Sequence, residues 1–315
     1  MSLPLIGAAD IEALGPAAAV DALEEALREG LDPETVPARS NLTVPGGELL
    51  LMPATTQDVT GVKIAGVAPG NAALGLPRIT GSYLLLDGPT LVPLALLDGA
   101  ALTTLRTPAV SALAVRHLTV PSVGHLVIFG TGPQAYGHLT AVLAERPVDR
   151  LTVIGRTPER VASLVAHART LGLRADEGGP EEVATADLVL CCTTSRTPLF
   201  DGASVRDGAT VVAVGSHLPD ARETDSRLVA RSIVLVEARS AALAEAGDLL
   251  VPIAEGAIAP EDIAGNLADL VSQDGVGTEL RKELASSGRP RFFKSVGMGW
   301  EDLAIAAAVH RRLNP

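Results

Sequence analysis

The stretch Val127-Ile128-Phe129-Gly130-Thr131-Gly132-Pro133-Gln134-Ala135 decides the fold of this chain. It reads as a strand, the glycine pattern G-x-G-x-x-A and the start of a helix. Gly130 permits the tight turn, Gly132 lets the backbone approach a pyrophosphate, and the small Ala135 lets the helix pack close to the strand. The N–H groups at the helix start then hold the anion, with Thr131 and Gln134 beside it. The pattern predicts a dinucleotide-binding turn; the alternative is a glycine turn without a ligand.

The regions on either side of this motif show different patterns. After it, apolar strand-like runs alternate with helical patterns, which predicts a parallel sheet covered on both faces. These strands are expected at residues 126–129, 151–154, 188–192, 211–214 and 233–236, with helices from about Gln134 and about Pro158. Before it, a mixed α/β unit is indicated by a helical pattern from Pro16 to Gly30. Its short strands are expected at 42–44, 48–52, 62–67, 83–86 and 92–97, with a hairpin turn at 87–90.

Two further helical patterns complete the chain. The first covers residues 102–118 and contains Pro108, which should kink or restart the helix because proline lacks the N–H group. The second follows a short strand-like entry near Phe292 and forms an alanine-rich helix that ends near Leu313.

The composition narrows the possible functions. The 315 residues, of which 47% are hydrophobic and 20% charged, are enough for a large core and two domains. A net charge of -12 repels a phosphate backbone, so nucleic-acid binding is not expected. The first residues lack the basic and apolar regions of a signal peptide, and no apolar run is long enough to span a membrane. The adjacent Cys191 and Cys192 favour a reducing, cytoplasmic setting, because neighbouring cysteines rarely form a structural disulfide.

The end of the second strand indicates which dinucleotide is bound. NAD enzymes place an acidic residue there to bind the ribose hydroxyls. This chain instead has Arg156, followed by the hydroxyl of Thr157 and by Arg160. A guanidinium group at this position suits a 2′-phosphate, which favours NADP(H) over NAD(H). The alternative is that Arg156 is a solvated surface arginine.

Separate stretches of the chain resemble the ornithine cyclodeaminase/mu-crystallin family. They run in order from about residue 35 to about residue 305, and the resemblance is specific because the motifs are spread and collinear. The matching pieces are Leu51–Ala54, Gly61–Lys63, Pro69–Asn71, Gly75–Pro77, Leu96–Gly99, Leu102-Thr103 with Arg106-Thr107, the Gly130 turn, Ala246–Leu249, Phe293–Gly297 and Glu301–Leu303.

The resemblance implies a fold, an assembly and a set of site residues. It implies a Rossmann-type doubly wound domain at residues 119–297 and a mixed α/β substrate and dimerisation domain at 1–118, completed by the helix at 298–315. The Rossmann domain would lie between the two parts of the other domain, with the active site in the cleft. The resemblance also implies a homodimer. By the family pattern, Arg39 and Arg106 bind a substrate carboxylate and Lys63 lies beside the reacting carbon–nitrogen centre. Arginine offers a planar fork for a carboxylate, whereas the lysine pKa falls readily on burial.

Other candidate residues lie in or near the same motifs. Met52 and Val296 are expected at the substrate, while Thr107, Thr193, Thr194, Val214 and Gly215 are expected at the cofactor. Lys294 either touches the cofactor or anchors the return strand. Arg39 and Arg106 have a structural alternative as solvated or carbonyl-capping residues. For Lys63 that alternative is weaker, because it lies in an apolar strand of a chain with only three lysines.

One position departs from the cyclodeaminase pattern. Cyclodeaminases and the alanine dehydrogenases of the family place an aspartate two residues after the glycine that is Gly215 here, and this chain has His217 instead. Mu-crystallin-like imine reductases also lack that aspartate, and their Pro-Asp-x-Arg-Glu run resembles Pro219–Glu223. We therefore expect an NADPH-dependent reductase of a cyclic α-imino acid, with Lys63 or His217 handling the proton. The alternative for His217 is a loop histidine at the edge of the cleft.

The sequence leaves alternatives to an imino acid reductase. Ornithine cyclodeaminase and alanine dehydrogenase are the alternatives within the family, and an NADPH-dependent small-ligand binding protein is a third. A hydrolase is disfavoured because no G-x-S-x-G motif is present. No metal site is expected, since the six histidines show no paired ligand spacing.

Overall fold

The computed structural model describes residues 3–314, which form two compact units. Unit 1 contains the chain up to Val110 and again from Gly297, whereas unit 2 contains Ser111–Val296. The helix α3 (Gly99–Leu118) runs from the first unit into the second. Among the helices of residues 3–314, none combines the length and the hydropathy that a bilayer crossing needs.

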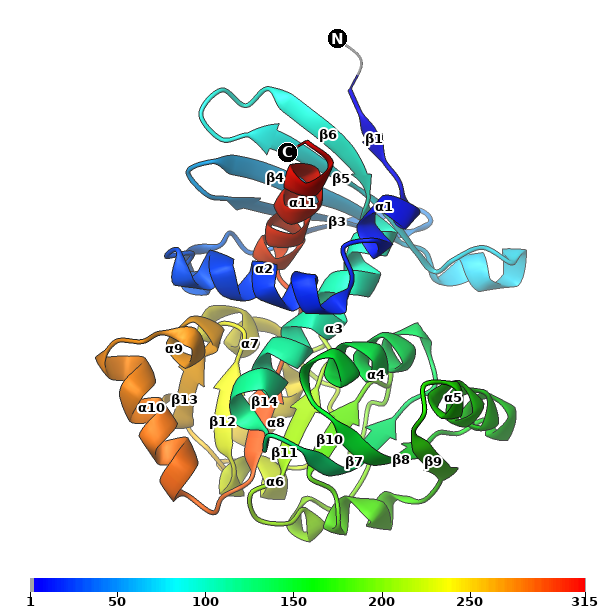
Figure 1. Ribbon diagram of the computed structural model, residues 1–315, viewed down its shortest axis with the longest axis vertical. Helices are drawn as coiled ribbons and strands as arrows, with labels where there is room; N and C mark the ends of the chain where they lie inside the picture. Colours follow the sequence, from blue (N-terminus) through cyan, green and yellow to red (C-terminus); the bar gives the residue numbers. More distant parts are fainter. Residues whose placement is uncertain (1–2, 315) are drawn as a thin grey trace. The chain divides into compact units, whose positions relative to one another are not determined.

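Unit 2 is built on an eight-stranded sheet in which every neighbouring pair is parallel (Figure 1). Its order is β13-β12-β14-β11-β10-β7-β8-β9, so the chain leaves β7 in one direction and returns to its other side at β10. Such a reversal is where doubly wound sheets bind ligands. The strands are β7 (Val123–Phe129), β8 (Val148–Ile154), β9 (Arg174–Glu177), β10 (Leu188–Cys191), β11 (Thr210–Ala213), β12 (Ile233–Val236), β13 (Ile263–Asn266) and β14 (Arg291–Lys294).

Both faces of this sheet are buried, as its apolar strands require. In β10 all four residues are buried, and so are all four in β11 and in β12. Side chains on alternate strand positions therefore face two separate apolar layers, which is the pattern expected of a parallel sheet covered on both sides. The helices of this unit are α4 (Pro133–Glu145), α5 (Pro158–Thr170), α6 (Ser226–Arg231), α7 (Arg239–Glu245), α8 (Gly247–Ala254), α9 (Leu267–Val271) and α10 (Gly275–Ser286).

Unit 1 contains a six-stranded sheet in the order β1-β6-β5-β4-β3-β2. The pairs from β2 to β6 are antiparallel, and only the short β1 joins β6 in parallel. The elements are β1 (Leu5–Ile6), α1 (Ala8–Glu12), α2 (Pro16–Arg28), β2 (Ser40–Val44), β3 (Gly47–Thr55), β4 (Val59–Val67), β5 (Ile79–Asp87), β6 (Pro93–Asp98) and α11 (Gly299–Leu313). The hairpin turn expected at residues 87–90 is present between β5 and β6, where Thr90 donates to the Asp87 carboxylate.

The C-terminal helix α11 covers one face of the unit 1 sheet by packing against β3, β4 and β5 (Figure 1). The covered face is buried at Met52, Lys63 and Tyr83. The opposite face carries apolar side chains that stay exposed, among them Leu51 and Ile64, which are directly paired across β3 and β4. One face of this sheet therefore belongs to the interior of unit 1, whereas the opposite face remains an apolar surface.

The expectation that Pro108 restarts its helix is wrong. The helix α3 continues from Gly99 to Leu118 with Pro108 inside it. A proline costs one N–H hydrogen bond and strains the preceding turn. Leu102 before it and Leu113 after it are both fully buried, so packing on either side holds the helix together across the missing bond.

Candidate cofactor and substrate sites

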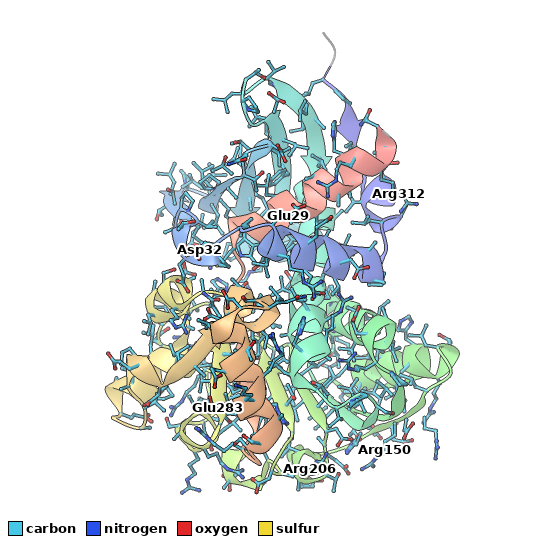
Figure 2. All side chains as sticks on the ribbon, turned by 60° about the vertical axis from the view of Figure 1, so that its left-hand side comes forward. Glu29, Asp32, Arg150, Arg206, Glu283 and Arg312 are labelled. Atoms are coloured by element: carbon cyan, nitrogen blue, oxygen red, sulfur yellow. The ribbon has the colours of Figure 1, made fainter. Side chains whose placement is uncertain are left out.

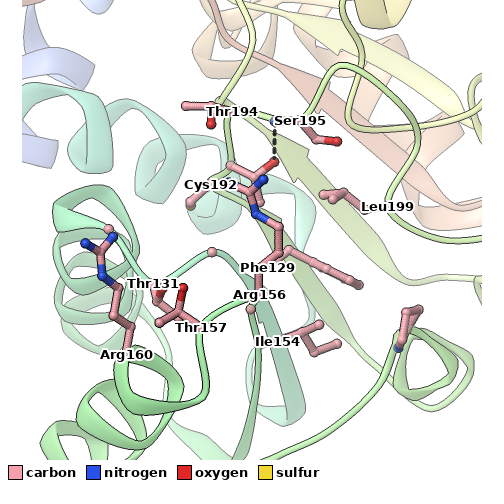
Figure 3. Close-up of a pocket in the computed structure, with 15 residues that line it drawn as sticks. Phe129, Thr131, Ile154, Arg156, Thr157, Arg160, Cys192, Thr194, Ser195 and Leu199 are labelled. Atoms are coloured by element: carbon pink, nitrogen blue, oxygen red, sulfur yellow. Dashed lines mark hydrogen bonds between the residues drawn. The ribbon is translucent and has the colours of Figure 1, made fainter. Parts of the chain in front are cut away.

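A cavity of about 420 Å³ lies at the carboxyl ends of β7, β8 and β10 in unit 2 (Figure 3). Eight of the predicted cofactor residues line it, namely Gly130, Thr131, Gly132, Arg156, Thr157, Arg160, Thr193 and Thr194. The lining also includes Cys192, Ser195 and Leu199, which were not predicted to lie at the cofactor. The strand ends thus bring the glycine turn and three separate loops to one opening.

The glycine turn has the shape that a pyrophosphate needs. Gly130 has φ +109°, and a Cβ atom there would lie 2.4 Å from the carbonyl oxygen of Cys192. A Cβ on Gly132 would meet nothing within 4 Å, so the turn is open on that side. The helix α4 begins at Pro133 with no side chain capping its first N–H groups. These donors and the helix dipole are therefore available to an anion, and the residues present fit a dinucleotide.

Arg156 lies in the loop after β8 and Arg160 in the first turn of α5, and both line the cavity. In Figure 3, the Thr131 and Thr157 hydroxyl groups lie between the side chains of Arg156 and Arg160. Arg156 is exposed, so its guanidinium group can reorient toward a phosphate. Gly155 keeps the loop close to the glycine turn, because a Cβ there would lie 2.8 Å from the Thr131 methyl group. Hydroxyl and guanidinium donors therefore stand at the same opening as the glycine turn.

A second group of charges lies buried in unit 2. We name Glu223, Asp248 and Lys294 the Lys294 cluster. The Lys294 Nζ atom lies 3.1 Å from Asp248 Oδ2 and donates to the Ser216 carbonyl oxygen at 2.7 Å. Asp248 Oδ1 accepts from the backbone N–H groups of Glu223 and Thr224, each at 2.8 Å. All three charged side chains are essentially inaccessible to water.

The Lys294 cluster connects the ends of two strands. The Glu223 carboxylate accepts from the Thr193 N–H at 2.7 Å on one oxygen and from the Gly215 N–H at 2.7 Å on the other. Thr193 follows β10 and Gly215 follows β11. Burial raises the pKa of Glu223 to about 7, although Lys294 opposes this shift. The carboxylate thus fixes a loop that lines the cavity to the loop that carries His217.

Unit 1 contains a different buried group of charges, on the face of the sheet that α11 covers. We name Lys63, Arg106, Glu301 and Asp302 the Lys63 cluster. Lys63 Nζ lies 2.6 Å from Asp302 Oδ2, and Arg106 Nη1 lies 2.7 Å from Glu301 Oε2. Lys63 is 2% exposed and Arg106 7%, while neither acid is exposed at all. Burial lowers the pKa of Lys63, and Asp302 opposes that shift.

Two glycines make room for the Lys63 cluster. A Cβ on Gly61 would lie 2.2 Å from the Tyr83 hydroxyl oxygen, and Tyr83 is the residue directly opposite Lys63 in the β4–β5 register. A Cβ on Gly297, where φ is +82°, would lie 2.5 Å from Arg106 Nη1. Both glycines belong to the motifs that carry the family resemblance, and both have a steric reason to be glycine.

The remaining predicted residues lie elsewhere. Arg39 is half-buried just before β2, and Met52 is buried in β3 with its carbonyl oxygen near Gly299. Val296 ends unit 2, where its N–H donates to Glu237 at 2.5 Å. His217 is exposed on the loop after β11. Six predicted cofactor residues do not line the cavity: Thr107, Gln134, Ala135, Val214, Gly215 and Lys294.

The sequence analysis did not predict a role for four acidic residues, although each of them binds a predicted cation or the backbone of a loop that carries predicted residues. They are Glu223, Asp248, Glu301 and Asp302. Each of these acids lies in a motif that resembles the family, so the sequence did contain a signal that could have pointed to them. Their partners could not be read from the sequence, because Lys63 and Asp302 are 239 positions apart.

The comparison with protein families decides the membership of the chain. The family model of ornithine cyclodeaminase and mu-crystallin matches residues 9–315. The chain belongs to the ornithine cyclodeaminase/mu-crystallin family. Among curated family members, it is 37% identical over 270 residues to the Δ1-pyrroline-2-carboxylate reductase of Colwellia psychrerythraea, an alignment that covers 84% of this chain and 83% of that protein.

Solved structures of the ornithine cyclodeaminase/mu-crystallin fold agree along the whole chain. The Δ1-pyrroline-2-carboxylate reductase of Thermococcus litoralis, solved with NADH and L-proline, has a TM-score of 0.90 and 29% identity, covering 99% of this chain and 98% of that one. An archaeal alanine dehydrogenase dimer with bound NAD has a TM-score of 0.91 and 25% identity, covering 100% and 97%. The predicted Rossmann-type sheet with a second mixed α/β domain is confirmed.

Proposed function

We propose that this chain is a nicotinamide-dependent reductase of a cyclic α-imino acid. The substrates would be Δ1-pyrroline-2-carboxylate or Δ1-piperideine-2-carboxylate, and the products L-proline or L-pipecolate. The similarity to the Colwellia reductase, 37% identity across 84% of the chain, carries this proposal. His217 supports it, because an aspartate at this place is typical of the cyclodeaminases and alanine dehydrogenases of the family.

The cofactor would be held by unit 2. The backbone of Gly130–Gly132 and the start of α4 would bind its pyrophosphate, and Thr193 and Thr194 line the same cavity. Arg156 and Thr157 favour NADP(H), since they offer a guanidinium group and a hydroxyl to a 2′-phosphate. A bound reduced nicotinamide supplies the hydride that the C=N carbon takes up.

The substrate would be held by unit 1. Arg39 and Arg106 would bind its carboxylate, which fixes the C=N bond that is to be reduced. The ring nitrogen must be protonated for its carbon to become electrophilic, and Lys63 or His217 would supply or stabilise that proton. Lys63 is better sheltered from water, since it is 2% exposed whereas His217 lies on an exposed loop.

A panel of spectrophotometric assays tests this proposal. Purified protein is given NADPH or NADH with pyrroline-2-carboxylate, with piperideine-2-carboxylate, and with pyruvate plus ammonia. A parallel reaction contains L-ornithine and NAD and is assayed for ammonia. We expect NADPH oxidation with a cyclic imino acid. Ammonia release from ornithine without net change in the cofactor would favour a cyclodeaminase, and NADPH binding without any turnover would favour a ligand-binding protein.

The same proposal includes a homodimer that forms through unit 1. The uncovered face of its sheet exposes Leu42 at 58%, Ile64 at 42% and Leu51 at 37%, a contiguous apolar surface on neighbouring strands. A second copy of the chain is the occupant that this face fits, and the alanine dehydrogenase relative was solved as a dimer. Light scattering should give twice the chain mass, and Ile64→Glu should reduce it to one chain. We also expect a cytoplasmic location, because Cys191 and Cys192 are both free thiols.

A further inference from the structure

Two adjacent acids begin the helix that covers the unit 1 sheet. Glu301 and Asp302 lie in the first turn of α11 and are both fully buried. Asp302 pairs with Lys63 on β4 at 2.6 Å and lies farther, 3.8 Å, from Arg106 Nε, whereas Glu301 pairs with Arg106 on α3 at 2.7 Å. The positive end of the helix dipole stabilises carboxylates at this position. Both acids thus lie at the end of the helix where a negative charge is favoured, each beside a buried cation.

We propose that Asp302 is a positioning residue that keeps Lys63 protonated as the acid of the reaction, and that Glu301 is a positioning residue that aims Arg106 at the substrate carboxylate. This inference rests on the proposed function, since it assigns the proton and the carboxylate of that reaction to separate pairs. Neither acid would need to touch the substrate.

The surroundings of Lys63 show why it needs a partner. Its ammonium group has lost nearly all contact with water, and Arg106 places a second positive charge in the same cluster. Both effects lower the pKa of Lys63, whereas Asp302 and, more weakly, Glu301 raise it. The Tyr83 hydroxyl faces the same region and stays neutral, because burial and Asp302 raise the pKa of Tyr83 well above its usual value. Asp302 is therefore the main group that favours the protonated lysine.

The hydrogen bonds around Lys63 also direct its proton. One N–H group donates to Asp302 Oδ2 at 2.6 Å and another to the Thr103 hydroxyl at 3.3 Å. Thr103 accepts that bond because its own O–H donates to the Gly99 carbonyl oxygen at 2.8 Å. Among the described residues this accounts for two of the three N–H groups of the ammonium, and the third is the one we assign to the imine nitrogen.

The reduction step then balances without protonating Asp302. A hydride, with the two electrons that a bound reduced nicotinamide would supply, would form the new C–H bond while the C=N π bond breaks. The nitrogen lone pair takes the proton of the Lys63 ammonium and forms the N–H bond that makes the carbon electrophilic, and the π electron pair becomes the lone pair of the amine product. The neutral lysine is reprotonated from solvent, and Asp302 remains a carboxylate that favours this return.

Glu301 has the corresponding task at Arg106. Its Oε2 atom holds Arg106 Nη1 at 2.7 Å, and its Oε1 atom accepts from the Met298 N–H at 3.1 Å. The carboxylate therefore joins the guanidinium group to the start of α11. Gly297, which has no side chain, leaves room for Arg106 on the same side. A guanidinium group held by a carboxylate in this way is fixed in position and direction.

The first experiment reads the Lys63 proton directly and needs no turnover. The chain has only three lysines, so labelling with [ε-13C]lysine gives three NMR signals, which lysine-to-arginine variants assign. Lys282 is 66% exposed at its side chain and serves as the internal control. Asp302→Asn should lower the pKa of Lys63 by about 1–3 pH units and leave Lys282 unchanged. Asp302→Glu, which keeps the charge, should restore most of the shift. A Lys63 pKa that Asp302→Asn leaves unchanged would overturn the inference.

The second experiment separates the two pairs by kinetics. In Asp302→Asn, the alkaline limb of kcat should move to lower pH by the same amount as the Lys63 pKa. In Glu301→Gln, KM for the imino acid should rise about tenfold or more, and that limb should move to lower pH by clearly less than in Asp302→Asn. Equal effects of both variants on KM and on the limb would contradict the division of tasks. Absence of imino-acid turnover in the unmodified protein would instead overturn the proposed function, and the NMR result tells these failures apart.

Discussion

The two buried groups of charges in this protein differ in their balance. The Lys63 cluster pairs two cations with two carboxylates, so its formal charge is zero. The Lys294 cluster has two carboxylates and one lysine, so one negative charge lacks a counter-ion within it. Burial of an ion is costly unless it is paired, and the cost appears as a shifted pKa. Charges that the protein exposes to solvent, such as Arg150, Arg206 and Glu283 in Figure 2, escape this cost.

The difference in formal charge between the two clusters agrees with the different roles that we assign to them. In the Lys63 cluster each cation has a partner within 2.7 Å, so both stay charged and can act on a substrate. In the Lys294 cluster the unmatched carboxylate, Glu223, has a pKa raised to about 7. Its hydrogen bonds all go to loop backbone and to the Thr193 hydroxyl, so it organises the cavity wall. The Lys63 cluster, whose charges balance, can keep its cations charged for a reaction. The Lys294 cluster, whose charges do not balance, connects two loops with an interaction that depends on pH.

The largest effect is expected at the balanced cluster. Lys63→Ala removes the proposed acid and leaves Asp302 buried without its partner. We expect kcat to fall about 10²–10⁴-fold, the usual loss for a general acid. Lys282→Ala is the control, because its side chain is exposed and pairs only with a neighbouring acid on the same helix. Steady-state rates of NADPH oxidation check this. Equal losses in the two variants would remove Lys63 from the mechanism.

A nearly equal effect, on stability, is expected at the unbalanced cluster. Asp248→Asn removes the carboxylate 3.1 Å from Lys294 and weakens the acceptor of the Glu223 and Thr224 N–H groups. Glu223 still balances the charge of Lys294, so we expect a cost near the lower end of the range for breaking a buried pair, about 3 kcal/mol. The matched control is Glu279→Gln, which breaks a pair with the same kind of cation at the surface, where both side chains are more than half exposed. That change should cost less than about 1 kcal/mol. Urea unfolding measures both, and similar costs would contradict the burial argument.

The pH dependence of stability should reveal the unmatched carboxylate of the Lys294 cluster. The pKa of Glu223 rises from 4.5 to about 7 on folding, so the folded protein binds this proton more tightly and loses stability as pH rises through that range. The buried His138 does the opposite: its pKa falls from 6.5 to about 4, so it adds stability as pH rises. In the unmodified protein the two slopes largely cancel.

Substitution separates these two contributions. Glu223→Gln should make the free energy of unfolding increase by about 2 kcal/mol between about pH 5 and pH 6.5, relative to the unmodified protein, because one pKa unit corresponds to about 1.4 kcal/mol. His138→Gln should make it decrease by a similar amount. Urea unfolding at both pH values measures these changes in the free energy of unfolding. If Glu223→Gln shows the slope of the unmodified protein, Glu223 is not the titrating group.

Much of this arrangement could be read from the sequence, because local patterns encode it. The strand that ends at Phe129, the glycine turn and the helix starting at Pro133 are contiguous, so composition and spacing predict them. The strand β9 could not be predicted, since its residues Arg-Ala-Asp-Glu have no apolar run and it lies at the edge of the sheet. The pairing of Lys63 with Asp302 also escapes local patterns, because only the packing of α11 on β4 brings them together.

The smallest effect is expected at an exposed charge, where solvent can replace a lost partner. Arg156 lies at the rim of the cavity, outside both clusters, and we predict that it contributes to the choice between NADPH and NADH. Arg156→Asp should reduce the ratio of kcat/KM for NADPH over NADH about 10–100-fold, since a charged hydrogen bond to phosphate is lost and an acid that can bind ribose hydroxyls is gained. Arg174→Asp, on β9 and exposed, is the control and should leave the ratio unchanged. A preference that survives Arg156→Asp would assign the discrimination to Arg160 or Thr157.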